Sequence, residues 1–193
     1  MLKFHEVEIA GLKRQLPLYQ IEEDVFIPLF IAHNDIALIQ SAAKALLDRV
    51  VDFDVIVTEE IQGISLAYAM SLLAGKERFI VARKNAKAYM DDVVAIQILQ
   101  KDDEEYKRLY VSKEEADYIS NKRVLLVDDV ILYGQTMDSL FELTNALGGY
   151  VVGEASIIHH GFEYHSSDIP INSLVTLPLF NADGSVYQKE ENK

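Results

Sequence analysis

The stretch from Arg123 to Gly149, RVLLVDDVILYGQTMDSLFELTNALGG, decides the fold class of this chain. Its apolar run Val124 to Val127 is typical of a strand that is buried on both faces. Two carboxylates, Asp128 and Asp129, come next, at the carboxyl end of that strand. A short loop with one glycine then leads into a helical segment, which we expect to begin at Thr136 and to stop at the double glycine. The stretch therefore predicts a strand, an acidic pair, a loop and a helix.

This order of parts predicts a site for a small ligand. In open α/β sheets, ligands lie in the crevice beyond the carboxyl ends of the strands. A loop that opens a helix aims backbone N–H groups at an anion, and carboxylates accept hydrogen bonds from hydroxyl groups. A sugar phosphate suits both features, since it carries hydroxyls on one side and a phosphate on the other. The alternative is an ordinary turn of an α/β sheet, in which the acidic pair caps the loop.

The segment VLLVDDVILYGQT resembles the phosphoribosyl-pyrophosphate motif of type I phosphoribosyltransferases. That motif consists of a hydrophobic strand, two acidic residues, two apolar residues and a short loop. The resemblance implies that Asp128 and Asp129 are the catalytic residues and hold the ribose hydroxyls. Carboxylates placed there would also stabilise positive charge that develops on a ribose carbon. The loop is expected to wrap the 5′-phosphate through Tyr133, Gly134, Gln135 and Thr136.

A second candidate site is the turn Glu60–Gly63, which follows a predicted strand and precedes a predicted helix. Such a turn presents backbone N–H groups to an anion, or it is simply the start of a helix. Adenine phosphoribosyltransferases carry the similar sequence Glu-Ala-Arg-Gly as a pyrophosphate loop. The resemblance implies that Glu60, Gln62 and Gly63 face pyrophosphate, with Gln62 where the family usually has arginine.

Three basic residues within five positions form a third candidate site. Arg83, Lys84 and Lys87 follow a predicted strand of an otherwise acidic chain, which indicates a place for an anion. They resemble the Arg-Lys-x-x-Lys segment of the family, which contacts pyrophosphate. The alternative is a solvated surface turn.

Two further features have weaker functional signals. The segments Val93–Leu99 and Tyr106–Val111 both favour strand and predict a hairpin. In the family the corresponding hairpin is a mobile lid over the reacting centre, so Tyr106 and Lys107 are candidate lid contacts. The adjacent pair His159–His160 does not favour a metal site, since neighbouring side chains of a strand point to opposite faces.

Composition limits the partners of the chain. It has 193 residues, no cysteine, and 31 acidic against 18 basic side chains, for a formal net charge of −13. This balance argues against a nucleic-acid partner, which needs a basic face. Met1–Ile9 alternates rather than forming an apolar signal core, and no apolar run is long enough to span a membrane. Because a chain without cysteine also suits a reducing compartment, we expect a cytoplasmic protein without a membrane partner.

Strands that alternate with helices predict an α/β fold, with an open, mostly parallel sheet and helices on both faces. The length suits a single domain over residues 1–193. We expect its core at about residues 34–158. The two chain ends, at about 1–33 and 159–187, are expected to form a small hood, which in the family binds the base.

Local patterns predict two details of these parts. In the hood, Lys3–Ile9 and Leu16–Ile21 should form a hairpin, and Pro17 should place the second strand at a sheet edge. In the core, Asp35 or its neighbour Asn34 should cap a helix. The inner face of that helix should hold Ile36, Ile39, Ala43, Leu46, Leu47 and Val50.

The resemblance as a whole implies a phosphoribosyltransferase of the adenine-like branch. Its reaction would transfer a phosphoribosyl group from phosphoribosyl pyrophosphate to a purine-type nucleobase, in purine salvage, with release of pyrophosphate. Mg²⁺ is the implied cofactor, with no protein ligand assigned to it, and a homodimer is the expected assembly. In the loop, Leu132 and Tyr133 are bulkier than the small residues of the family, and Gln135 replaces glycine or lysine. The alternative is therefore a regulatory protein that binds phosphoribosyl pyrophosphate or a nucleotide and has diverged from catalysis.

Overall fold

A five-stranded parallel sheet forms the centre of the computed structural model, which describes residues 3–90, 92–99, 106–161 and 169–187. The order across the sheet is β10, β9, β8, β4, β5, and every neighbouring pair is parallel. The strands are β4 (Val55–Glu59), β5 (Ile80–Ala82), β8 (Arg123–Ile131), β9 (Tyr150–His160) and β10 (Ile171–Leu177). The predicted open, parallel α/β sheet is confirmed.

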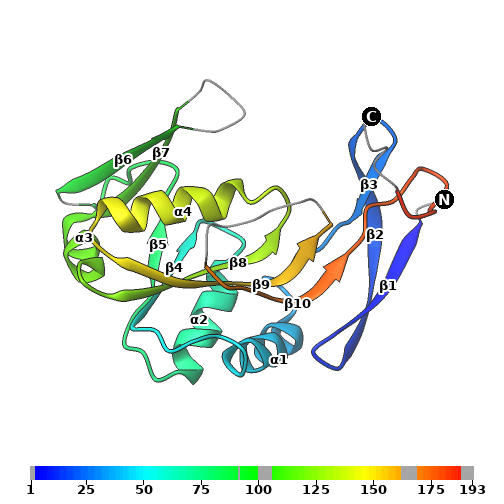
Figure 1. The fold of residues 1–193 in the computed structure, drawn as a ribbon, viewed down its shortest axis with the longest axis horizontal. Coiled ribbons are helices and arrows are strands. Elements are labelled where there is room, and N and C mark those ends of the chain that lie inside the picture. Colours follow the sequence, from blue (N-terminus) through cyan, green and yellow to red (C-terminus); the bar gives the residue numbers. More distant parts are fainter. Residues whose placement is uncertain (1–2, 91, 100–105, 162–168, 188–193) are drawn as a thin grey trace.

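Helices cover both faces of this sheet (Figure 1). They are α1 (Ile36–Leu47), α2 (Ile64–Leu73), α3 (Lys113–Ile119) and α4 (Gln135–Ala146). The alternation of side chains along β8 explains the two layers. Leu125 and Val127 belong to the core under α1 and α2, whereas Val124 and Leu126 belong to the core under α3 and α4. No helix in the described part of the chain combines the length and apolar character that crossing a membrane requires.

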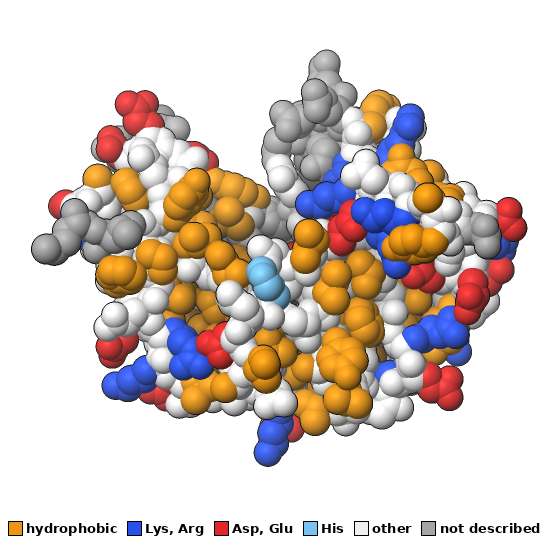
Figure 2. Space-filling view, turned by 180° about the vertical axis from the view of Figure 1, so that it is seen from behind, with side chains coloured by type: hydrophobic (Ala, Val, Ile, Leu, Met, Phe, Trp, Pro, Cys, Tyr) orange, Lys and Arg blue, Asp and Glu red, His pale blue; other side chains and the backbone are white. Residues whose placement is uncertain are grey.

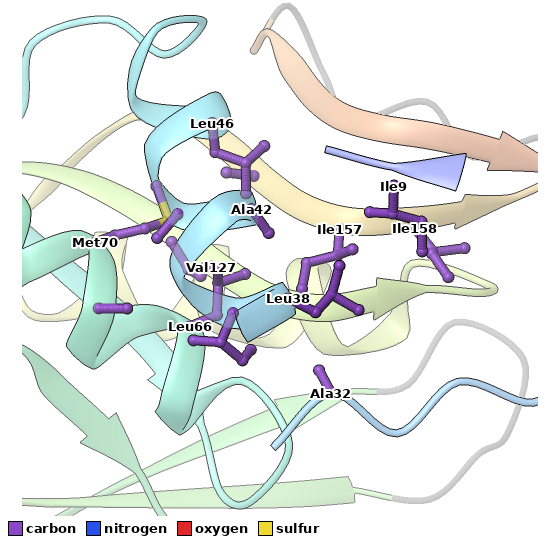
Figure 3. Packing of buried hydrophobic residues seen from close by; sticks show 14 of the residues in the cluster. Ile9, Ala32, Leu38, Ala42, Leu46, Leu66, Met70, Val127, Ile157 and Ile158 are labelled. Carbon is purple, nitrogen blue, oxygen red and sulfur yellow. The ribbon is translucent and has the colours of Figure 1, made fainter. Parts of the chain in front are cut away.

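The core beneath α1 is shown in Figure 3, where Leu38, Ala42 and Leu46 of this helix lie over the sheet. Asp35 caps the helix, as expected, because its side chain accepts the Leu38 N–H at 3.1 Å. The expectation that Ile36 faces the core is wrong, since this side chain is 74% exposed. At 100° per residue, Ile36 lies about 200° around the helix from Leu38 and faces away from the sheet.

The three N-terminal strands form the hood, an antiparallel sheet at one end of the molecule (Figure 1). They are β1 (Phe4–Ile9), β2 (Leu12–Glu22) and β3 (Val25–Pro28). The predicted hairpin is confirmed, but the edge position of its second strand is wrong, because β2 lies between β1 and β3. Proline is tolerated there because β2 changes partner at this point. Residues up to Pro17 pair with β1, and residues from Leu18 onward pair with β3.

Polar contacts from β2 and β3 are among those that tie the hood to the rest of the chain. Arg14 of β2 donates to Asp35, the cap of α1, with its Nε 2.6 Å from Oδ2. Phe26 of β3 and Phe180 exchange two backbone hydrogen bonds of 2.8 and 2.9 Å. Of the range 159–187 expected in the hood, Phe180 thus reaches it, whereas residues 171–177 extend the central sheet as β10.

The predicted hairpin of β6 (Val93–Leu99) and β7 (Tyr106–Ser112) is confirmed as an antiparallel pair. It stands near α3 and α4, at the end of the molecule away from the hood (Figure 1). Arg83, just after β5, and Tyr110 of β7 exchange two backbone hydrogen bonds, which join the hairpin to the sheet. Residues 100–105 between the two strands lie outside the described residues, as does the end of the chain at 188–193.

Candidate functional site

The acidic pair lies near the carboxyl end of β8. The strand continues past the predicted end at Val127 to Ile131, because its last residues still pair with β9. After a short loop, α4 begins at Gln135 rather than at Thr136. The pair therefore sits on rigid sheet rather than on a loop, at the edge where ligands bind in open α/β sheets.

The two carboxylates differ in exposure, since Asp128 is half-buried whereas Asp129 is buried. Asp129 is 4% exposed, and its side chain accepts the backbone N–H of Ala32. The Asp129 N–H in turn donates to Oδ1 of Asp128 at 2.9 Å. Burial raises the pKa of both carboxyl groups, and the charges of Asp129 and Glu59 raise the pKa of Asp128 further. Within the described residues neither carboxylate forms an ion pair, so its charge is poorly compensated in the protein alone.

Gly63, which immediately precedes α2, packs against this pair. A Cβ at residue 63 would lie 3.0 Å from Oδ1 of Asp128 and 2.3 Å from Oγ1 of Thr58. No side chain fits in that space, so glycine is required on steric grounds. The contact brings the predicted turn Glu60–Gly63 directly beside the acidic pair, with the uncapped start of α2 behind it. Within this turn the Glu60–Ile61 peptide bond is cis.

Two glutamates at the end of β4 form ion pairs with three lysines. Glu59 is 4% exposed, and its carboxylate lies 3.2 Å from the Lys84 ammonium and 2.5 Å from that of Lys107. Glu60 lies 3.3 Å from the Lys87 ammonium and accepts the backbone N–H of Lys84 at 2.8 Å. Although burial opposes it, these hydrogen bonds hold the pKa of Glu60 below its ordinary value. The cluster places positive groups of β7 and of the segment after β5 next to the turn.

Arg83 is directed away from this cluster. Its guanidinium donates to Glu115 of α3 at 3.2 Å and to the carbonyl of Val81 at 2.8 Å. Glu115 also closes the predicted capping box of α3 with Ser112. Of the three predicted basic residues, the structure brings Lys84 and Lys87 to the turn and places the Arg83 side chain between β5 and α3.

The loop after β8 turns its large side chains toward the hood. Leu132 packs on an apolar cluster that contains Val25 and Ile27 of β3. The Tyr133 hydroxyl donates to Glu22 Oε1 at 2.6 Å. Burial, followed by this bond, raises the pKa of the Tyr133 phenol to about 12. The two bulky residues thus fasten the loop to the hood instead of filling the space before α4.

The start of α4 remains suited to an anion. Gly134 has a φ of 79°, a left-handed conformation that favours glycine, and it turns the chain into the helix. No side chain caps the first N–H groups of α4. Gln135 is exposed and Thr136 is half-buried in this first turn. These are the predicted phosphate contacts, and the structure brings them to the end of the strand that carries the acidic pair.

Sequence reasoning missed two contributors to the site and only suggested a third. Ala32 acts through its backbone N–H, for which no side-chain pattern exists. Glu59 could have been found, because a carboxylate that ends the apolar run of β4 is as unusual as the pair on β8. Lys107 was a candidate lid contact, and the structure brings it to Glu59.

A closed metal cage is not formed by the described residues. They contain no cluster of three or more His, Cys, Asp or Glu side chains that could hold a metal ion. His160 is only 1% exposed and its pKa is lowered to about 4, mainly by burial. Any metal at this site would need further ligands from the substrate or from water.

Comparison with known proteins identifies the arrangement. No family model matches the chain. An adenine phosphoribosyltransferase of Malacoplasma penetrans is 30% identical over 132 residues, which cover 68% of this chain and 72% of that protein. The chain belongs to the type I phosphoribosyltransferase family. Members of this family are transferases, and we class the chain with them as a phosphoribosyltransferase.

This phosphoribosyltransferase also resembles a xanthine phosphoribosyltransferase in sequence and a solved adenine phosphoribosyltransferase in fold. A xanthine phosphoribosyltransferase of Brevibacillus brevis is 25% identical over 142 residues, or 70% of this chain and 71% of that protein. The crystal structure of an adenine phosphoribosyltransferase from Thermoanaerobacter pseudethanolicus has a TM-score of 0.65 and 19% identity. That match covers 90% of this chain and 95% of the other. At such identity the structural likeness shows the fold alone.

Proposed function

We propose that this phosphoribosyltransferase transfers a phosphoribosyl group from phosphoribosyl pyrophosphate to a purine-type, adenine-like nucleobase and releases pyrophosphate. The observation that carries the proposal is the packing of Gly63 against Asp128. This contact sets a turn that can bind an anion directly beside the half-buried carboxylate of Asp128 and the buried one of Asp129. A substrate with ribose hydroxyls next to a pyrophosphate matches that pairing.

In this reaction the ribose hydroxyls donate to Asp128 and Asp129. Such donors favour the ionised carboxylates, so binding would lower the pKa values that burial has raised. The ionised pair then stabilises the positive charge that develops on the reacting ribose carbon as the bond to pyrophosphate breaks. Because Asp129 is held by the Ala32 N–H, this charge is already oriented before the substrate arrives.

The 5′-phosphate is assigned to the start of α4. There the first N–H groups of the helix, together with the side chains of Gln135 and Thr136, act as donors. Gly134 allows the backbone to approach the phosphate, and Tyr133 contributes through its backbone because its hydroxyl is bonded to Glu22.

Pyrophosphate is assigned to the turn of Glu60, Gln62 and Gly63, with Lys84 and Lys87. The two lysines now lie against glutamates, so binding requires their ammonium groups to turn from carboxylate to pyrophosphate oxygens. Arg83 has a supporting role in this proposal, since its bond to Glu115 fixes the segment that carries both lysines.

Mg²⁺ fits this site as a partner of the substrate. Oxygen ligands are what this ion prefers, and it commonly keeps waters and phosphate oxygens rather than an all-protein cage. The carboxylates of Asp128 and Asp129 are the side chains that would lie beside it. When bound, the ion would neutralise the charge of the departing pyrophosphate.

A second candidate function is binding without efficient turnover. It is favoured by the engagement of Lys84, Lys87 and Lys107 with Glu59 and Glu60, which an anion must displace. A protein of this kind would retain the ribose contacts and sense phosphoribosyl pyrophosphate or a nucleotide. The two functions predict the same ligand site and differ only in turnover.

The expected homodimer has a suitable surface on α1 and α2. A groove of about 650 Å³ lies between these helices, and its rim includes the exposed side chains of Ile36, Ile61, Tyr68 and Leu72. None of the residues that line it is acidic, although the chain carries a net charge of −13. A second copy would therefore meet no carboxylate among the residues that line this surface, and we assign a second copy as its occupant. Figure 2 shows one face of the molecule, where hydrophobic side chains gather across the middle and charged side chains lie between them and along the edge.

The cellular setting follows from composition. A chain without cysteine suits a reducing compartment, so we place its activity in the cytoplasm. Its acidity makes small molecules, rather than nucleic acids, the partners to test.

The test offers adenine, hypoxanthine, guanine, xanthine and orotate one at a time, with phosphoribosyl pyrophosphate and Mg²⁺, and follows the release of pyrophosphate. Turnover with adenine above the other bases is the expected result. Calorimetric binding of phosphoribosyl pyrophosphate without turnover on any base would instead establish the second candidate. Absence of binding would overturn both. The variant with Asp128→Asn and Asp129→Asn is the control for a signal that does not come from this site.

A further inference from the structure

The loop between β8 and α4 is attached to the hood by its two large side chains. The Tyr133 hydroxyl donates to Oε1 of Glu22 at 2.6 Å, and Glu22 is the last residue of β2. Leu132 packs on the apolar cluster of β3, to which Leu179 also belongs. Segments from both ends of the chain therefore hold this one short loop.

The same loop leads directly into the start of α4. Gly134 follows Tyr133 and precedes the helix, whose first N–H groups no side chain caps. Its carbonyl accepts the Asp138 N–H at 2.9 Å and so begins the hydrogen bonding of the helix. Because consecutive Cα atoms are only about 3.8 Å apart, a displacement of Tyr133 passes almost directly to these N–H groups.

The hood and α4 are held by the molecule in different ways. Within the described residues, the strands of the hood form a sheet of their own and are not part of the central sheet. In contrast, α4 is fixed to the central sheet by the buried side chains of Met137 and Leu140. The loop thus joins a part that can adjust its position to a part that is set by the core.

The bond between Tyr133 and Glu22 is suited to transmit such an adjustment. Both side chains are exposed, but the acceptor is an ionised carboxylate, which makes the bond stronger than one between neutral groups. Burial and this bond raise the pKa of the Tyr133 phenol to about 12, so the hydroxyl remains a donor at neutral pH. The residues that make the link, Leu132 and Tyr133, are the two that are bulkier than those of the family.

We propose that Glu22 is a positioning residue that couples the hood to the phosphate loop through Tyr133, so that a nucleobase and a sugar phosphate bind cooperatively. The proposal rests on the proposed function, because it takes adenine as the ligand of the hood and a sugar phosphate as the ligand of the loop. Glu22 touches neither ligand. It acts by making the position of the loop depend on the position of the hood.

The test is calorimetric titration of the full-length chain with ribose 5-phosphate, first alone and then with saturating adenine. The ratio of the two affinities is the coupling factor, which we expect to be about fivefold or more in the unmodified protein. Coupling between binding sites is reciprocal, so titration with adenine, alone and with saturating ribose 5-phosphate, should give the same factor. Pyrophosphate is left out, so that no turnover disturbs the titration.

Variants of Glu22 separate a positioning role from a general effect on the hood. Glu22→Ala should reduce the coupling factor about threefold or more, because one charge-assisted hydrogen bond is lost. Its affinity for ribose 5-phosphate alone should stay within about twofold of the unmodified protein. Glu22→Gln keeps an acceptor oxygen for the Tyr133 hydroxyl and should retain most of the coupling. The matched control is Glu23→Ala, which removes the next exposed glutamate and should leave the factor unchanged.

A double-variant cycle tests whether Glu22 acts through Tyr133. Tyr133→Phe breaks the same hydrogen bond from its other end. Combining it with Glu22→Ala should therefore give the coupling factor of either single variant, rather than a further loss. Any coupling that comes from direct contact between the two ligands remains in all three variants.

The proposal is overturned if Glu22→Ala couples the two ligands as strongly as the unmodified protein does, or if Glu23→Ala loses the coupling equally. It is also overturned if the unmodified protein binds the two ligands independently, a result that leaves both binding sites standing. If ribose 5-phosphate binds and adenine does not, the proposal fails together with the choice of adenine. Failure to bind ribose 5-phosphate overturns the proposed function itself.

Discussion

At the end of β8, the half-buried Asp128 and the buried Asp129 have no ion pair among the described residues, whereas at the end of β4, Glu59 and Glu60 are compensated by three lysines. Both sites are acidic pairs at the same edge of one parallel sheet. The first is held by backbone contacts from Ala32 and Gly63. The second is held by long, flexible side chains.

The difference indicates what each side of the site does when a ligand binds. The pair on β8 has raised pKa values and gains stability when hydroxyl donors or a cation arrive, so it is prepared for the ligand. The glutamates on β4 already have cations and must release them to an anion. Ribose binding should therefore need little movement, and pyrophosphate binding should need the lysines to change partner.

The largest effect should come from the pair on β8. Changing Asp128→Asn together with Asp129→Asn should weaken ribose 5-phosphate binding by a hundredfold or more, about 3 kcal/mol, because two charged acceptors are lost. Calorimetry gives the affinity. The matched control is Asp117→Asn, on the exposed side of α3, which should bind as the unmodified protein does. Unchanged affinity in the double variant would remove the ribose site from β8.

The second-largest effect should come from Gly63, whose packing against Asp128 joins the pair on β8 to the turn after β4. Gly63→Ala places a Cβ against Thr58 and Asp128 and should destabilise the fold by about 1–3 kcal/mol while also weakening ribose 5-phosphate binding. Urea unfolding and calorimetry measure the two effects. Gly161→Ala is the control, because a Cβ there would meet its nearest neighbour at an ordinary 3.6 Å. If both variants behave alike, the close packing at residue 63 has no functional weight.

Removing Lys107 tests the ion pairs of the glutamates at the end of β4. Lys107→Met leaves the buried Glu59 with the more exposed Lys84 as its one cation among the described residues, so the free energy of unfolding should fall by about 1–3 kcal/mol. Lys113→Met removes an exposed lysine paired with Asp117 on one turn of α3 and should cost less than about 0.5 kcal/mol. Equal losses would mean that the cluster at the end of β4 is an ordinary surface network.

The pair on β8 should also make the stability of the protein depend on pH. The raised pKa of Asp128 means that the folded state holds its proton more tightly than the unfolded state does. This stability is present below the ordinary carboxylate range near pH ~4 and is lost as pH rises through neutrality. Relative to the unmodified protein, Asp128→Asn should therefore gain stability between pH ~4 and pH ~8, by about 2 kcal/mol.

Asp54 provides a control of opposite sign for that pH series. Hydrogen bonds from Arg123 lower its pKa to about 2, so its contribution is present above the ordinary range and is lost as pH falls. Asp54→Asn should therefore be less stable than the unmodified protein at neutral pH, and the difference should shrink in acid. Denaturation at a series of pH values measures both variants. A flat difference for Asp128→Asn would contradict the burial of that carboxylate.

The smallest effect should arise at the hood. Tyr133→Phe removes one hydrogen bond to Glu22, the last residue of β2, and should cost about 0.5–1 kcal/mol, with faster amide exchange where β2 ends and pairs with β3. Tyr19→Phe, an exposed tyrosine on β2, is the matched control. Titration of the phenols should also lose one group with a pKa of about 12 in Tyr133→Phe alone. Identical exchange in the two variants would mean that the loop is not held by this bond.

Much of the fold was predictable because its signals are local. Apolar runs marked the central strands, Asp35 and Ser112 marked helix starts, and Gly63 and Gly134 marked tight turns. The errors arose where a neighbour decides the outcome. The central place of β2 depends on β3 pairing beyond Pro17, which no property of β2 alone reveals.

The candidate site likewise has one part that the sequence predicted and one part that it did not. The sequence by itself indicated the acidic pair, the glycine loop after it and the turn Glu60–Gly63 as parts of one candidate site, because each is a short run of residues with a recognisable order. Only the tertiary structure decided that Ala32 donates to Asp129, that Glu59 collects lysines, that Arg83 turns to α3, and that Tyr133 reaches Glu22. These contacts join residues from different strands and loops. Which residues meet is decided by how the sheet brings the ends of its strands together. No short stretch of the sequence encodes that arrangement.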